Sequence, residues 1–143
     1  MPEGLNLPLL LGAAFSAIAG VLHLAVIAAG PRWYRLFGAG ERMARAAEQG
    51  RVYPALVTAV IATVLLVWSA YALSAAGLMR PLPLLLPVIC LITLVYLARG
   101  LLGPLVLAGT GRSRRFIAVS SAICLGGGLL HLLGVVQQWL VLG

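Results

Sequence analysis

The sequence predicts an all-α membrane protein: a four-transmembrane-helix bundle with a short amphipathic cytoplasmic helix between the first and second spans. Of its 143 residues, 62% are hydrophobic and 9% are charged, whereas a soluble domain is about half apolar and about a quarter charged. Four apolar runs approach or exceed the roughly twenty residues that a helix needs to cross a bilayer. Such uniform runs do not fit the alternating strands of a membrane barrel, so helices are expected.

The first span is expected at residues 7–29, where Gly30 and Pro31 end the apolar run. Glu3 precedes it and no arginine does, so it lacks the basic start of a cleaved signal peptide and we expect it to be retained. The other spans are expected at residues 54–77, 82–101 and 116–141, which makes residues 1–143 one integral membrane domain. Residues 100–108 are apolar but too short to cross again, so they either extend the third helix or rest at the interface.

The loop at residues 38–50 is expected to form the short surface helix. Glu41 and Arg45 stand one helical turn apart, a spacing that favours an ion pair. This helix is interpreted mainly as a basic topology determinant, and contact with anionic lipid is the alternative.

Arginine placement predicts the orientation. Arginine-rich loops resist translocation and stay in the cytoplasm, and only Arg80 is expected on the opposite side. We therefore expect a bacterial inner-membrane protein with both termini in the periplasm, and we interpret Arg99 as an anchor at the inner interface. Nine of the ten arginines lie in or beside the first and third connections: Arg32, Arg35, Arg42, Arg45, Arg51, Arg99, Arg112, Arg114 and Arg115.

Two histidines are the ionisable residues that fall well inside the expected spans. An ionisable group there is costly, so its side chain should face the bundle interior and marks a candidate functional site. His131 shares a helical face with Ser120, Cys124, Gly127, Gly134 and Gln138, and His23 shares one with Gly12 and Ser16. The candidate ligand-binding residues are the two histidines and nearby small or polar groups: His23, His131, Ser16, Gly127, Tyr96 and Thr93.

Three interpretations of the histidines stay open. They are interior hydrogen-bonding residues, they line a ligand or transport pocket, or they hold a haem as a pair. His23 lies nine residues from Arg32 and His131 sixteen from Arg115. At a rise of about 1.5 Å per residue their depths differ by roughly 10 Å, which counts against haem. No cofactor is therefore expected, with haem as the lesser possibility.

Enzyme motifs are missing from the sequence. It contains no Gly-x-Ser-x-Gly elbow, no His-Glu-x-x-His zinc helix and no phosphate loop. Cys90 and Cys124 both fall in spans and form no Cys-x-x-Cys pair, so we interpret them as small packing residues. The short basic loops do not indicate nucleic-acid binding. Whether the chain is an enzyme is uncertain, and the sequence leans against it.

Three segments resemble a family of small uncharacterised bacterial four-span membrane proteins: Trp33 to Arg42, Tyr53 to Thr58, and Tyr71 to Gly77. The resemblance covers most of the chain and implies a location in the membrane, with no activity attached to it.

The function expected from the sequence is that of a non-enzymatic ligand-binding or transport-type bundle. Its interior polar pocket would lie near His23 and His131. One alternative is a structural or accessory subunit that associates through small-residue faces, and a second is a bis-histidine haem-binding redox protein. The expected partners are the lipid bilayer and either a second copy or another membrane protein.

Overall fold

A computed structural model describes residues 4–142 and shows six helices in that part of the chain. Four of them are long and apolar enough to cross a membrane. The expected all-α fold with four spanning helices is confirmed. The helices are α1 (Leu7–Ala29), α2 (Pro31–Leu36), α3 (Glu41–Glu48), α4 (Tyr53–Ala75), α5 (Leu85–Val106) and α6 (Arg114–Leu142).

The boundaries of α1 coincide with the expected residues 7–29 because both ends carry strong local signals. The Asn6 side chain accepts a hydrogen bond from the backbone N–H of Leu9 at 2.9 Å, which satisfies a donor at the helix start. Gly30 follows the last turn with φ of 88°, a conformation that glycine adopts without strain.

The expected third span at residues 82–101 is shifted in the structure. Helix α5 begins at Leu85, after Leu84 adopts a left-handed φ of 56°. It then continues through Pro104 to Val106, so the stretch after Gly100 extends the helix. Arg99 therefore lies seven residues before the end of α5, about 10 Å inside it. Of the two alternatives for residues 100–108, the structure has the one in which they extend the third helix, as far as Val106.

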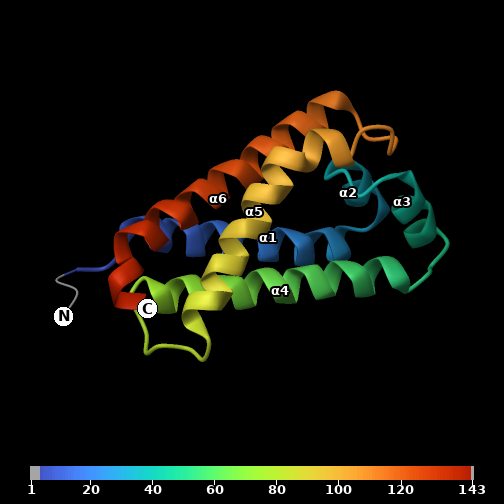
Figure 1. Cartoon of the computed structure of the whole chain (residues 1–143). Coiled ribbons are helices and arrows are strands. Elements are labelled where there is room, and N and C mark those ends of the chain that lie inside the picture. The colour runs from blue at the N-terminus through green and yellow to red at the C-terminus, as the bar shows by residue number, and fades with distance from the viewer. Residues whose placement is uncertain (1–3, 143) are drawn as a thin grey trace.

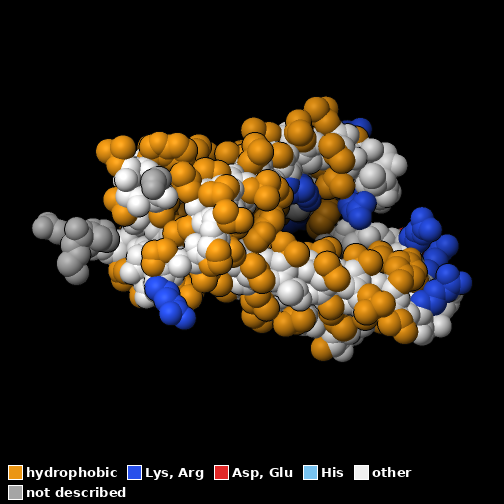
Figure 2. All heavy atoms as spheres, turned by 60° about the horizontal axis from the view of Figure 1, so that its bottom comes forward, with side chains coloured by type: hydrophobic (Ala, Val, Ile, Leu, Met, Phe, Trp, Pro, Cys, Tyr) orange, Lys and Arg blue, Asp and Glu red, His pale blue; other side chains and the backbone are white. Residues whose placement is uncertain are grey.

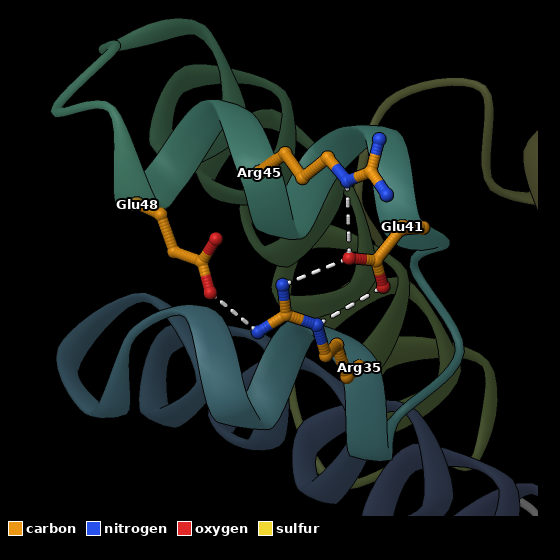
Figure 3. Close-up of polar contacts among 4 residues, drawn as sticks. All are labelled: Arg35, Glu41, Arg45 and Glu48. Atoms are coloured by element: carbon orange, nitrogen blue, oxygen red, sulfur yellow. Dashed lines mark hydrogen bonds and ion pairs between the residues drawn. The ribbon is translucent and has the colours of Figure 1, made fainter.

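The first connection holds two short helices rather than one. The expected helix at 38–50 is present as α3, and the six-residue α2 precedes it. The expected pair between Arg45 and Glu41 forms at 3.3 Å, and Arg35 of α2 adds contacts to Glu41 at 2.9 Å and Glu48 at 2.6 Å (Figure 3). Arg35 thus ties α2 to both ends of α3.

The spanning helices form two antiparallel pairs (Figure 1). In the first pair, Ser69 of α4 donates a hydrogen bond to the Ala13 carbonyl of α1 at 2.8 Å. In the second pair, α5 and α6 approach closely because Gly100 and Gly128 have no side chains. A Cβ built on Gly100 would lie 2.6 Å from the backbone nitrogen of Leu125.

The two pairs touch along only part of their length. Helix α1 meets α6 where the Phe15 ring packs on Gly127 and where Gly12 packs on His131. Farther along α1, Gly20 packs on Leu66 of α4 instead. The pairs then diverge toward the end that carries α2 and α3 (Figure 1). Figure 2 shows a hollow between them with arginine side chains in it.

The ends of the molecule differ in charge. Both ends of the described chain and the α4–α5 turn lie at one end, whereas α2, α3 and the α5–α6 loop lie at the other (Figure 1). The two arginine-rich connections are therefore at the same end. They are also in contact, because Arg112 donates hydrogen bonds to the carbonyls of Gly38 at 2.6 Å and Ala39 at 3.1 Å.

Candidate functional site

Tyr96 of α5 lies at the point where all four spanning helices meet. Its hydroxyl shares a 2.7 Å hydrogen bond with Ser16 of α1. Its ring contacts Phe15 of α1 and Trp68 of α4 edge-on, with centroids 5.3 and 5.2 Å away. The His131 ring of α6 lies 5.2 Å from it at a tilt of 35°. This set of five side chains is called the Tyr96 cluster below.

His131 contributes the imidazole of the Tyr96 cluster and has an exposed fraction of 0%. Its Nδ1 lies 2.7 Å from the Gly127 carbonyl oxygen one turn earlier. A carbonyl only accepts, so Nδ1 carries the proton, and in the neutral ring Nε2 is left as an acceptor. Nε2 is fully buried and has no hydrogen-bond partner within residues 4–142.

Two glycines make room for this arrangement. A Cβ built on Gly12 would lie 2.8 Å from Cε1 of His131 and 3.0 Å from Nε2, so the imidazole occupies the space that a side chain would fill. A Cβ built on Gly127 would lie 2.5 Å from the Phe15 ring. Helix α6 runs unbroken through its three consecutive glycines, and two of them serve close packing.

His23 and Thr93 are not part of the Tyr96 cluster. His23 is half-buried and its ring bonds to the Ala19 carbonyl of its own helix at 2.6 Å. It stands eleven residues beyond Gly12, the position that contacts His131, so about 16 Å separates the two levels along α1. Thr93 is buried, but its hydroxyl donates to the Ile89 carbonyl of its own helix at 2.8 Å.

The separation of the histidines bears on metal and haem chemistry. Two imidazoles that share one metal each bring a nitrogen to about 2 Å from it, which levels about 16 Å apart do not allow. Within residues 4–142 no group of three or more His, Cys, Asp or Glu side chains is placed to hold a metal ion. His131 Nε2 is the nitrogen in the Tyr96 cluster with a lone pair to offer.

Sequence reasoning missed Phe15 and Trp68. Ser16, Tyr96, Gly127 and His131 stand out as small or polar residues in apolar helices, whereas an aromatic ring in an apolar run carries no such contrast. The small-residue faces of α1 and α6 are used inside the chain, since Gly12 and Gly127 contact neighbouring helices. They therefore do not indicate a seam with another protein.

A second polar group lies nearer the α2–α3 end, between α5 and α6. Arg99 is half-buried and donates to Ser121 at 3.2 Å and Ser120 at 3.1 Å. Gly103 lies one turn after Arg99, and a Cβ built there would lie 2.5 Å from Nη1 of the guanidinium. The side chain of Arg99 thus crosses over Gly103 to reach α6.

Two surface hollows lie away from His131. One of about 370 Å³ lies beside α3 and is lined by Arg42, Arg45 and Arg51, among others. Another of about 670 Å³ lies at the opposite end and is lined by Asn6, Gln137 and Gln138, among others. His131 itself has no exposed surface, so the Tyr96 cluster is closed around it in this conformation.

Comparisons with protein-family models, curated proteins and solved structures each found no match. The resemblance to small four-span membrane proteins stays a prediction from the sequence.

Proposed function

We propose that this chain is a non-enzymatic membrane protein that binds a small apolar ligand carrying a hydrogen-bond donor, with His131 Nε2 as its acceptor. The single observation that carries this proposal is the buried Nε2 without a partner. Leaving a buried acceptor unpaired costs about 1–3 kcal/mol. A ligand hydroxyl or amine would recover part of that cost. A buried polar group that destabilises the fold calls for another explanation, and within a membrane span that explanation is by default a functional site.

The surroundings of His131 favour a ligand that is otherwise apolar. Phe15, Trp68 and Tyr96 give the cluster three aromatic rings, and the hydroxyls of Ser16 and Tyr96 are already bonded to each other. Phe15 and Trp68 are half-buried, whereas Tyr96 and His131 are buried. The proposed site at His131 is more buried than His23. The sequence predicts one pocket near both histidines, and the proposal is limited to His131.

The test compares two probes that differ by one donor. Decanol carries a hydroxyl donor, and decyl methyl ether has the same kind of chain with an acceptor only. In purified protein in a neutral detergent, we expect decanol to raise the unfolding temperature more than the ether does. His131→Phe keeps an aromatic ring without the acceptor, so the difference between the probes should vanish. His23→Phe is the matched control and should keep it.

Nitrogen NMR of ¹⁵N-histidine-labelled protein supplies a second readout. The Nε2 resonance should report an unbonded acceptor without probe and should shift when decanol is added. Equal stabilisation by both probes, or an Nε2 that is already hydrogen-bonded to water in the probe-free protein, would contradict the proposal.

The proposed location is a bacterial inner membrane with both termini on the periplasmic side. Its support is the placement of the arginine-rich connections, α2–α3 and α5–α6, at the same end of the bundle (Figure 1). The opposite end has Arg80 in the α4–α5 turn. Positively charged loops are retained in the cytoplasm. Association with a second copy or another membrane protein stays a prediction.

A further inference from the structure

Arg99 carries a charge for which the described chain supplies no counter-charge. The carboxylates of residues 4–142 are Glu41 and Glu48, and both are bonded to Arg35 at the membrane-surface helices. Arg99 instead lies inside a spanning helix and bonds only to neutral hydroxyls. A charged side chain within a span is expensive and marks a functional site when it faces a cavity or a partner.

The Arg99 group has hydrogen-bond donors to spare. A guanidinium has five N–H donors, and Arg99 uses two of them, on Ser120 and Ser121. Ser120 donates its own proton to the Ile117 carbonyl at 3.3 Å. Ser121 accepts from Arg99, and its hydroxyl donates to no residue within 4–142. Three N–H groups and one O–H therefore remain to bind an acceptor, with a full positive charge behind them.

The depth of Arg99 in the bundle decides what kind of anion can reach it. Arg99 lies one turn past Tyr96, beyond the level at which α1 leaves α6. At this end the pairs diverge, and Figure 2 shows arginine side chains in a hollow with hydrophobic side chains around it. In a bilayer, apolar walls at this depth are covered by acyl chains. A molecule with an anionic head and apolar tails therefore suits donors at this depth.

We propose that Arg99, with Ser121, binds the phosphate of an anionic phospholipid whose acyl chains occupy the hollow between the two helix pairs. Basic pockets between spanning helices at the cytoplasmic side are a general mode of phospholipid recognition. Arg112, Arg114 and Arg115 lie in the α5–α6 loop and at the start of α6, at the same end of the bundle, and attract anionic headgroups to it. Gly103 is part of the site because it leaves the room in which the guanidinium lies. The site is separate from His131.

The experiment measures phospholipid binding by native mass spectrometry of delipidated protein in a neutral detergent. Dioleoyl-phosphatidylglycerol, which has a net negative head, should bind more tightly than dioleoyl-phosphatidylcholine, whose phosphate is neutralised by its own ammonium group. Arg99→Gln should weaken phosphatidylglycerol roughly tenfold or more, as expected for a lost charge-assisted hydrogen bond. Inorganic phosphate at millimolar concentration should not displace the lipid.

Two controls separate the site from general charge and from misfolding. Arg51→Gln removes one exposed arginine of the same end and should leave phosphatidylglycerol binding unchanged. Gly103→Ala keeps the charge but displaces the guanidinium and should weaken binding, whereas Gly126→Ala adds its Cβ where nothing lies within 4 Å and should not. If Arg99→Gln does not fold, the two alanine variants carry the test.

Unchanged binding in both Arg99→Gln and Gly103→Ala, or equal binding of the two lipids, would overturn the proposal. Displacement of the lipid by inorganic phosphate would show a site for a soluble anion and would overturn the assignment to a lipid. None of these outcomes depends on whether His131 binds a donor.

Discussion

At the residue scale, the hydrogen bond between Ser16 and Tyr96 is a buried polar link between the two helix pairs. It is 2.7 Å long, and both side chains are buried. Interhelical hydrogen bonds in membranes contribute about 0.6 kcal/mol on average, with a maximum near 1.7. We therefore expect a coupling free energy of about 0.5–1.5 kcal/mol between these two hydroxyls.

A double-mutant cycle measures that coupling. Ser16→Ala, Tyr96→Phe and the double variant are unfolded reversibly in mixed micelles, and the coupling is the part of their destabilisation that does not add. The matched control is a second cycle in which Thr63→Val takes the place of Ser16→Ala. The Thr63 hydroxyl is exposed and bonds to Ala59 of its own helix. Thr63→Val should add independently to Tyr96→Phe. Additive Ser16 and Tyr96 effects would mean that this bond does not hold the pairs together.

The residues of the Tyr96 cluster show what helical spacing can and cannot predict. Spacing identifies Gly12, Ser16, Gly127 and His131 because small and polar residues on one face of an apolar helix are conspicuous. It also puts His23 on the face of Gly12 and Ser16. The structure departs from that expectation because α1 changes partner along its length, from α6 near Gly12 to α4 near Gly20. A face predicted from one helix does not specify which neighbour covers it.

At the element scale, the contact between α2 and α3 includes exposed ion pairs, and these make it sensitive to pH. Hydrogen bonds and charge from Arg35 lower the pKa of Glu41 and of Glu48 below their ordinary values. A carboxyl with a lowered pKa in the folded state stabilises that state above its ordinary pKa, about 4.3 for glutamate. The stabilisation is lost as the pH falls through the lowered value.

We therefore expect α3 to stay docked on α2 at pH 5 and above and to loosen as the pH falls below about 4. Amide hydrogen exchange of α3, corrected for the intrinsic effect of pH, measures the change. The effect should be small and should weaken in high salt, because exposed ion pairs are screened. Arg35→Gln should remove most of the pH dependence and leave only the part due to the Arg45–Glu41 pair, while Arg42→Gln, which removes no ion pair seen within residues 4–142, should retain it. An α3 equally protected at pH 3 and pH 6 would contradict this account.

The sequence predicts the helices themselves better than their ends. The limits of α1 follow from Asn6 and Gly30, which act locally. The end of α5 does not follow from local signals, because Pro104 is expected to stop a helix and here lies inside one. Helix α2 was missed because six residues are too short to show a hydrophobic period.

At the scale of the whole molecule, the two helix pairs are held together at one end and braced at the other. Near the chain termini they share an apolar core that includes Leu9, Ile89, Ile92 and Val135. At the α2–α3 end a separate small core of Val26, Tyr34 and Ala44 lies on the α1 side. There the brace is formed by Arg112 and by Phe116, whose ring packs on Gly38. Which helices pair, and so where a hollow opens, is set by glycine contacts that composition does not reveal.

The orientation of the molecule decides which leaflet supplies a lipid to Arg99. If the arginine-rich end faces the cytoplasm, alkaline phosphatase fused after Gly143 should be active and a fluorescent protein at the same place should be dark. Fusions at Thr110, in the α5–α6 loop, should give the reverse pattern. Glutamine at five positions of the first connection should mix the two orientations, because the charge bias sets them: Arg32, Arg35, Arg42, Arg45 and Arg51.

A dark phosphatase and a bright fluorescent protein after Gly143 would contradict this orientation. The hollow would then open to the outer leaflet, and the phospholipid at Arg99 would be drawn from that side. The charge bias would then fail to explain the orientation, because the eight arginines of the two connections would have crossed the membrane against the bias that loop arginines normally exert. The fusion experiment therefore tests both the orientation inferred from charge and the leaflet that supplies the lipid. Whether Arg99 binds the lipid is tested separately by the binding experiment.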